Sequence, residues 1–201
     1  MLTYQGRYRN ITRNLRIIGV DDGAFPADKR LKQHALLVSV LFQNLHVRVL
    51  RLGLIQVDGR DANRVLASLL RTVRFDVVML SGISFGGFNL IDIDELARVT
   101  CRPIIAIAGE RPDNAAVRKA LQTHFRDWKE RWRMVRSAGE LHSFKPLPEE
   151  PRMFFEVRGG SPSFARRAIA STAVISRLPE PIRVARILAR ELSHLAYPNL
   201  S

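Results

Sequence analysis

The sequence predicts an α/β fold built on a mixed sheet, in which three antiparallel strands are continued by parallel strands and flanked by helices. Two observations lead to this prediction. Three strand-like segments follow one another near the N-terminus, and the rest of the chain alternates between helical and buried-strand patterns. No internal repeat or Pro/Gly/Ser linker divides the chain, so we expect one domain over residues 1–201.

The first part of the chain supplies the antiparallel strands. A basic N-terminal arm over about residues 1–16 precedes them, with Arg7, Arg9 and Arg13 among tyrosines. The third strand alternates with period two, as a half-buried strand does. The three strands are expected at residues 16–20, 34–43 and 46–57.

The second part alternates helices and strands. Asp61 is a good N-cap, and Asp92 with Glu95 forms a capping box. Helices are expected at residues 61–72, 92–100, 127–138, 163–177 and 182–195, and a further helix is expected to begin near Pro112. Strands are expected at residues 76–80, 103–108 and 153–157, and a Gly-rich loop is expected at residues 81–91. This order matches a ribonuclease H-like fold, in which the ends of the first and fourth strands lie side by side. Asp21 and Ser81 should therefore be neighbours.

Charge is the strongest compositional signal. The formal net charge is +13, and only five of the 32 basic residues are lysine. Guanidinium groups bind phosphate with paired hydrogen bonds and stack on bases, so this composition favours a nucleic-acid partner.

Composition also excludes several classes of protein. The single cysteine, Cys101, rules out an internal disulfide and a cysteine-based zinc site, and the five histidines show no metal-ligand spacing. No apolar run is long enough to span a membrane, and the N-terminal residues lack the apolar core of a signal peptide. We therefore expect a cytoplasmic protein with no membrane partner.

The segment IIGVDDGAF (residues 17–25) carries the main site signal, because Asp21 and Asp22 end a buried strand. Carboxylates at such an edge can hold Mg²⁺ together with substrate phosphate oxygens. The alternative is that Asp22 and Gly23 form a turn. Successive strand residues point to opposite faces, so Asp22 can join Asp21 only if the strand has ended or bulged.

Several further segments carry a family resemblance. They are VDGRDA (57–62), DVVMLSGISFGGFNLIDIDEL (76–96), PIIAIAGERPD (103–113) and RLPEPIRVA (177–185), in this order with IIGVDDGAF. With these segments the chain resembles the endonuclease V superfamily, and more closely the archaeal endonuclease dU family, a former domain of unknown function. The matching segments cover most of the chain.

The resemblance implies a ribonuclease H-like fold and a divalent-metal-dependent endonuclease acting on deaminated bases such as uracil or hypoxanthine. Asp21 matches the first-strand catalytic aspartate. Asp61, or with less support Asp58, lies where the family places its second acid. Metal ligands would come from Asp21, Asp22 and Asp61, with Mg²⁺ or Mn²⁺ as cofactor.

The chain also departs from the endonuclease V pattern. Ser81 stands where the third acid is expected, no Gly-His step occurs near Gly160, and the strand-separating wedge has no counterpart before Asp61. A serine hydroxyl contributes no charge, so metal binding should be weakened. Asp22 or Asp92 could substitute, although Asp92 is favoured as a helix cap.

Nucleic-acid contacts are expected around Ser81 and in the loop that follows it. Phenylalanines there could stack on a flipped base and Asn89 could bind its edge, or the rings could anchor the loop in the core. Arg183, Arg186 and Arg190 form a basic stripe that is either a phosphate track or a solvated face. The nucleic-acid-binding candidates are Ser81, Phe85, Gly86, Gly87, Phe88, Asn89, Arg111, Arg183 and Arg186.

A basic helix carries Trp128 and Trp132 four residues apart, which favours a buried stripe over a stacking surface.

The sequence supports two main hypotheses about function. The leading one is a Mg²⁺-dependent endonuclease weakened by Ser81, with DNA favoured over RNA. The other is a non-catalytic nucleic-acid-binding protein on the same fold, and a protein–protein adaptor is a third class. The sequence leaves open whether the chain forms a homodimer.

Overall fold

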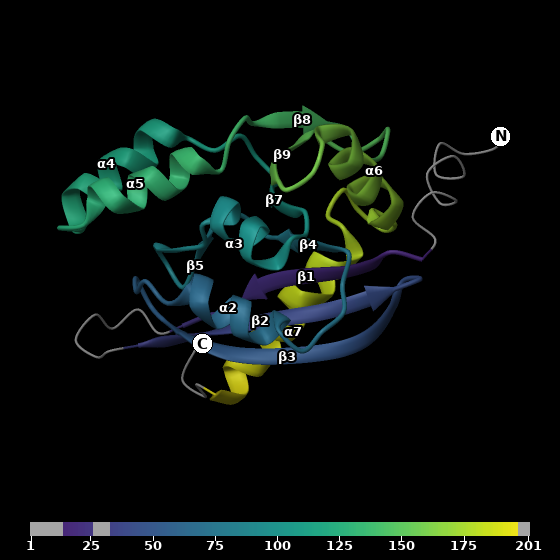
Figure 1. Ribbon diagram of the computed structural model, residues 1–201, viewed down its shortest axis with the longest axis horizontal. Helices are drawn as coiled ribbons and strands as arrows, with labels where there is room; N and C mark the ends of the chain where they lie inside the picture. The colour runs from purple at the N-terminus through teal and green to yellow at the C-terminus, as the bar shows by residue number, and fades with distance from the viewer. Residues whose placement is uncertain (1–13, 26–32, 197–201) are drawn as a thin grey trace.

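The computed structural model describes residues 14–25 and 33–196 (Figure 1). Most of the expected basic arm, residues 1–13, lies outside the described residues. Within them, seven strands form one sheet in the order β3-β2-β1-β4-β7-β9-β8. The strands are β1 (Arg16–Asp22), β2 (His34–Gln43), β3 (His46–Gln56), β4 (Val77–Leu80), β7 (Ile104–Ala108), β8 (His142–Phe144) and β9 (Met153–Arg158).

The pairing of the strands confirms the predicted mixed sheet. β1 pairs antiparallel with β2, and β2 pairs antiparallel with β3. β4 lies parallel to β1, and β7 lies parallel to β4. β9 and β8 then add an antiparallel pair at the far edge. The carboxyl ends of β1, β4 and β7 consequently meet at one edge of the sheet.

Three features differ from the sequence prediction. β1 continues in regular pairing to Asp22, where it lies opposite Leu37 of β2, instead of ending at residue 20. The expected Gly-rich loop contains a short hairpin of β5 (Ser84–Phe85) and β6 (Asn89–Leu90). β8 was not expected, because its three residues form too short a pattern to detect.

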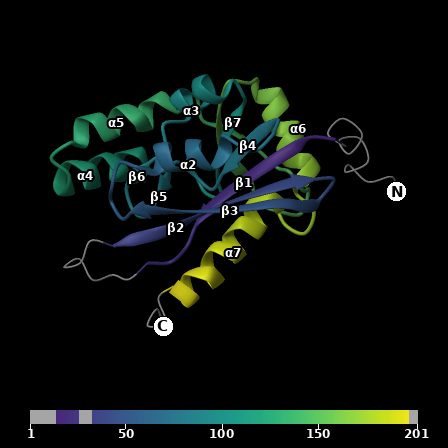
Figure 2. The same ribbon diagram turned by 60° about the horizontal axis from the view of Figure 1, so that its bottom comes forward.

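Helices cover both faces of the sheet (Figure 2). α2 (Ala62–Leu70) and α3 (Ile93–Thr100) pack on one face. α6 (Pro162–Thr172) and α7 (Glu180–Ala196) pack on the other face. α4 (Asn114–His124) and α5 (Trp128–Ser137) form a helical pair that packs with the segment around Leu90. α6 ends before the predicted residue 177, and α7 begins before the predicted residue 182. No helix within the described ranges is long and apolar enough to cross a bilayer.

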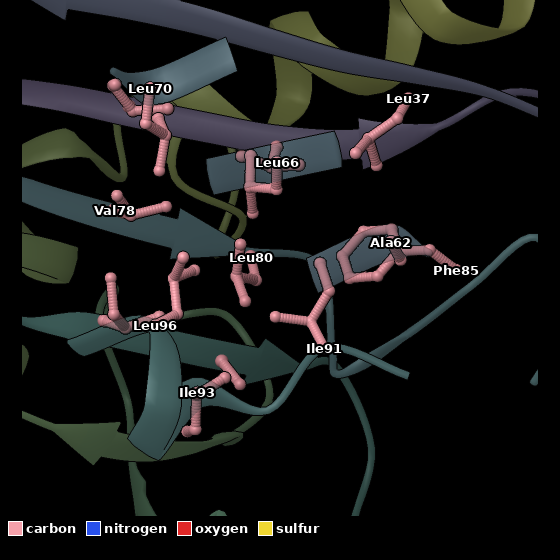
Figure 3. Packing of buried hydrophobic residues seen from close by; sticks show 14 of the residues in the cluster. Leu37, Ala62, Leu66, Leu70, Val78, Leu80, Phe85, Ile91, Ile93 and Leu96 are labelled. Carbon is pink, nitrogen blue, oxygen red and sulfur yellow. The ribbon is translucent and has the colours of Figure 1, made fainter. Parts of the chain in front are cut away.

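The larger core lies between the sheet and α2 and α3 (Figure 3). Leu66 of α2 and Leu80 of β4 are fully buried there, and Phe85 of the β5–β6 hairpin fills the end of the same cluster. Burying a side chain of this size stabilises the fold by about 1.5–3 kcal/mol relative to leaving it exposed. The hairpin is therefore anchored to the main core.

α7 crosses β1 at close range because Gly19 has no side chain. A Cβ atom at Gly19 would lie 2.1 Å from the carbonyl carbon of Pro181, well inside van der Waals contact. This approach places the first turns of α7 directly over the end of β1. Arginines on α7 can therefore reach the carboxylate of Asp21.

β3 is more exposed than its alternating pattern predicts. Among its residues only Ile55 is buried, because β3 forms one edge of the sheet. Leu50, Leu52 and Leu54 pair with β2 residues that α7 covers, but they themselves stay 39–57% exposed. The expected half-buried strand is thus an exposed edge strand.

Candidate functional site

Asp21 and Ser81 meet where β1 and β4 end, as the predicted strand order requires. The Ser81 hydroxyl donates to Oδ1 of Asp21 at 2.5 Å, and the Ser81 amide donates to the Val20 carbonyl at 3.1 Å. The Asp21 side chain is only 7% exposed. The edge therefore presents one buried carboxylate beside one hydroxyl.

Arg186 of α7 neutralises this carboxylate. Its Nε lies 2.7 Å from Oδ2 of Asp21, while the Arg186 side chain remains 55% exposed. Arg186 thus contacts Asp21 through Nε, and its two Nη nitrogens have no hydrogen-bond partner among the described residues. Charged groups that lose hydration need such a partner to remain ionised.

Asp22 faces the opposite side of the sheet from Asp21. β1 is regular at this point, and Oδ2 of Asp22 accepts a 2.6 Å hydrogen bond from the Gly86 amide in the β5–β6 hairpin. Burial raises the pKa of Asp22 to about 6, the hydrogen bond from Gly86 opposes this rise, and the neighbouring Asp21 charge adds to it. Asp22 therefore fastens the hairpin to β1, and its role as a metal ligand remains a prediction.

Asp58 and Asp61 precede α2, and both bind backbone or amide groups nearby. Oδ1 of Asp58 accepts from the Phe88 amide at 2.8 Å. Oδ1 of Asp61 accepts from the Gln56 amide at 3.1 Å and from Nδ2 of Asn89 at 2.6 Å, so Asp61 makes no side-chain cap on α2. Both carboxylates hold the segment before α2 against the hairpin.

Phe85 and Asn89, expected near a bound base, are both completely buried. Phe85 packs in the larger core, as the anchoring alternative requires. Asn89 uses its amide group to bind the Gln56 carbonyl, Asp61 and the Ala62 amide. In this arrangement neither side chain is free to contact a base, whereas Phe88 is half-buried and packs edge-on against Phe125 at 5.5 Å.

Arg131 is a structural residue that sequence analysis did not single out. It is 5% exposed, and its guanidinium donates to the carbonyls of Asp58, Gly59 and Phe88 at 2.6–3.0 Å. Its Nε also binds Asp127, one turn earlier on α5. The (i, i+4) spacing of these two residues was visible in the sequence, but the three distant carbonyls were not.

Two cavities adjoin Ser81. One, of about 500 Å³, lies beyond the ends of β4 and β7, and three arginines line it: Arg111, Arg177 and Arg186. Arg177 is held in place, because it donates to the carbonyls of Gly109 and Arg152. Glu110 is the acidic residue in this lining, so the cavity has an excess of positive charge.

The second cavity, of about 220 Å³, is mainly apolar. Ser81, Phe88 and Leu90 line one side, and Phe155 and Glu156 of β9 line the other. Burial raises the pKa of Glu156 to about 6, and the nearby Arg158 charge opposes the rise. Ser81 therefore separates a positively charged cavity from an apolar one that contains a single carboxyl group.

The remaining candidates, Arg183, the two tryptophans and Asp92, each have a structural partner elsewhere in the fold. Arg183 is bound by Glu180 in the first turn of α7, with Nε–Oε distances of 3.0 Å. Trp128 and Trp132 pack against the small cluster formed by Leu90, Leu121 and Val135, as the buried-stripe alternative predicts. Asp92 caps α3 through hydrogen bonds from Asp94 and Glu95.

The acidic side chains do not form a compact metal centre. In residues 14–25 and 33–196, no group of three or more acidic, histidine or cysteine side chains is placed to hold an ion. Asp21 and Ser81 supply one carboxylate and one hydroxyl. Because Mg²⁺ can bind through one carboxylate together with substrate phosphate oxygens, this donor set fits one ion and does not fit a pair of ions.

Comparison with known proteins identifies the family. The family described as Endonuclease dU matches residues 13–193. A UPF0215 protein of Methanopyrus kandleri is 35% identical over 189 residues, covering 91% of this chain and 93% of the relative. A crystal structure of a protein of unknown function from Archaeoglobus fulgidus has a TM-score of 0.78 at 26% identity, covering 89% of this chain and 98% of that one.

Endonuclease V structures share the fold. Ciona intestinalis endonuclease V, in complex with DNA containing an inosine followed by a ribo-adenosine, has a TM-score of 0.55 at 13% identity, covering 95% of each chain. At this identity the likeness shows the ribonuclease H-like fold alone. The family match and the curated relatives show that this chain belongs to the endonuclease dU family, and its fold is that of endonuclease V.

Proposed function

We propose that the chain is a divalent-metal-dependent endonuclease that acts on nucleic acid, preferably DNA, containing a deaminated base such as uracil or hypoxanthine. The observation that carries this proposal is the pairing of Asp21 with Ser81 where β1 and β4 end side by side. It is supported by membership of the endonuclease dU family and by the inosine-containing DNA in the Ciona intestinalis endonuclease V complex.

The residues where β1 and β4 end would have different roles in this reaction. Asp21 and Ser81 would hold one Mg²⁺ or Mn²⁺, which activates water and offsets charge on the phosphate. Arg111, Arg177 and Arg186 line the adjoining cavity and would bind phosphate oxygens, which guanidinium groups contact in pairs. Arg186 would bind phosphate either through its Nη nitrogens or after its contact with Asp21 is released.

The apolar cavity beside Ser81 would receive the deaminated base. Its volume of about 220 Å³ suits a single base, and Phe88 and Phe155 supply apolar surface. Glu156, the carboxyl group in this cavity, would accept a hydrogen bond from a ring N–H of uracil or hypoxanthine when ionised. Deamination gives both bases a ring N–H that cytosine and adenine lack, so this contact would distinguish uracil from cytosine and hypoxanthine from adenine.

A second candidate function is a nucleic-acid-binding protein without catalysis. The ion pair between Arg186 and Asp21 favours this reading, because the guanidinium occupies one oxygen of the carboxylate and its positive charge opposes the binding of a cation there. Ser81 adds no charge to attract the ion. The arginines of the cavity would still bind the phosphate backbone.

The test compares cleavage with binding. Labelled single- and double-stranded oligonucleotides carrying one uracil or hypoxanthine are incubated with Mg²⁺ or Mn²⁺ and with wild type, Asp21→Asn or Asp94→Asn. Asp94 is a matched control, because its carboxylate pairs with Arg98 and Arg158, neither of which lines a cavity beside Ser81. Nicking that is lost in Asp21→Asn and kept in Asp94→Asn supports the endonuclease, provided that thermal unfolding shows both variants folded.

Binding separates the remaining outcomes. Salt-sensitive binding without nicking, lost in Arg111→Glu, supports the non-catalytic function. No salt-dependent affinity for either strand type overturns both functions and leaves a role in protein–protein contact.

A further inference from the structure

A third cavity lies at the opposite end of β1 from Asp21. It measures about 780 Å³ and is lined by the last turns of α2 and α3 and the segments that follow them. Arg16 begins β1 and Asp21 lies five residues further on, so about 16 Å of strand separates this cavity from the Ser81 edge. The residues of the proposed endonuclease site are not part of its lining.

Four arginines line this cavity: Arg16, Arg71, Arg74 and Arg102. Arg16 is bound to Asp76 through Nε and Nη2 at 3.2 and 2.8 Å, and Arg102 lies close enough to Asp76 to lower the pKa of its carboxyl group. Arg71 and Arg74 are exposed, and their guanidinium groups make no hydrogen bond or ion pair with any residue that the structure describes. Two guanidinium groups are therefore available for a ligand.

The positive charge of the arginines that line this cavity exceeds the negative charge around them. The C-terminal end of a helix carries roughly half a negative charge, and α2 and α3 both have their C-terminal ends at the cavity. Four guanidinium groups against Asp76 and these two ends leave a local charge of roughly +2. No guanidinium of Arg71, Arg74 or Arg102 bonds to a helix carbonyl in the described chain, so capping does not account for them.

The floor of the cavity is apolar. Phe75 and Leu70 are buried beneath the arginines, and Val99 on the rim is 66% exposed. Small-molecule sites combine such an apolar surface with a few charged groups, and the volume lies within their usual range of about 300–1,000 Å³. A ligand that fits must carry a multiply charged anion joined to a flat or apolar part.

We infer that this arginine-lined cavity is a second ligand site, which binds a nucleoside diphosphate or triphosphate. Arg71 and Arg74 bind the phosphate oxygens, and the base lies against Val99 and the apolar floor. The bidentate geometry of guanidinium groups suits phosphate better than a single point charge does. This inference does not depend on the proposed endonuclease function.

Isothermal titration calorimetry with adenosine diphosphate, pyrophosphate and adenosine tests the inference. We expect saturable one-to-one binding of adenosine diphosphate, weaker binding of pyrophosphate and none of adenosine. The double variant Arg71→Gln/Arg74→Gln should weaken adenosine diphosphate binding at least tenfold. Val99→Gln should reduce the advantage of adenosine diphosphate over pyrophosphate, which reports on the base.

The matched control is Arg118→Gln/Arg133→Gln, which removes two exposed charges from α4 and α5. Equal loss of binding in this control would overturn the inference, because net charge alone would then explain binding. Equal affinity for pyrophosphate and adenosine diphosphate, or no binding at all, would also overturn it. Oligonucleotide nicking and binding should be unchanged in Arg71→Gln/Arg74→Gln, so this inference and the proposed endonuclease function can fail separately.

Discussion

Arg186 Nε lies 2.7 Å from Oδ2 of Asp21 and joins α7 to the end of β1. The two residues are 165 positions apart in the chain. The contact neutralises the one carboxylate that accompanies Ser81 at this edge. A cation that binds Asp21, or a phosphate that binds Arg186, would therefore compete with an ion pair that stabilises the folded protein.

Replacing Arg186 with Gln should destabilise the protein by about 1–3 kcal/mol, because Asp21 would remain buried without its charged partner. Urea-induced unfolding measures the change. Asp21→Asn in the same chain should recover part of the loss, giving a coupling energy of about 1 kcal/mol or more. Arg190→Gln, at an exposed position one turn further along α7, is the control and should cost less than about 0.5 kcal/mol. Strictly additive effects of the two site substitutions would contradict the expected coupling.

Replacing Arg131 with Met should destabilise the protein by about 3 kcal/mol or more, because three carbonyl groups lose their donor. Arg131→Lys should recover only a fraction, since an ammonium group cannot reach all three carbonyls at once. Chemical unfolding tests both variants. Arg133→Met, at an exposed position on the same helix, should be nearly neutral, and a comparable loss there would indicate that helix propensity or net charge is responsible.

The Gly87→Ala substitution should displace Asp58 and loosen the β5–β6 hairpin. A Cβ atom at Gly87 would lie 2.3 Å from Oδ1 of Asp58, and the backbone φ of +80° is itself unfavourable for alanine. We expect a loss of about 2–3 kcal/mol and faster hydrogen exchange at the Phe88 amide, which Asp58 binds. Gly82→Ala separates the two causes, because Gly82 has φ +108° but open space around its Cβ position. An equal cost at both glycines would show that backbone strain alone is involved.

The Glu156→Gln substitution should change the pH dependence of stability. The pKa of Glu156 is raised to about 6, so the folded state holds its proton more tightly than the unfolded state does. Its contribution to stability is therefore favourable at low pH and is lost as pH rises from about 4.5 to 6. Relative to wild type, Glu156→Gln should gain about 1 kcal/mol between pH 4.5 and pH 8, after allowing for partial exposure of the side chain. Thermal unfolding at the two pH values measures the difference, and parallel curves would contradict the assigned pKa.

Sequence periodicity was sufficient for most of the sheet. β2 and β7 are buried apolar runs, and α2 and α3 show apolar residues at helical spacing, so local patterns located them. The approach of Asp21 to Ser81 followed from topology, because parallel neighbours end at the same edge. The β5–β6 hairpin and β8 were missed because strands of two or three residues carry no measurable period.

The roles of polar side chains needed the tertiary structure. The sequence offered Asp22, Asp58 and Asp61 as metal or catalytic residues, and it could not tell that each one accepts a hydrogen bond that fixes the β5–β6 hairpin or the segment before α2. Asn89 was expected near a base and is fully buried among backbone groups. Carboxylates and amides bind ligands and backbone groups through the same atoms, so residue type alone does not separate these uses.

The sequence by itself determined the family, the strand order and the meeting of Asp21 with Ser81, because these depend on local pattern and on the way strands pair. Only the tertiary structure decided that Arg186 neutralises Asp21, that Arg131 binds three distant carbonyls, and that four arginines surround a cavity at the far end of β1. These relations arise where helices dock on the sheet. Docking depends on the summed packing of many residues far apart in the chain, which no local pattern records.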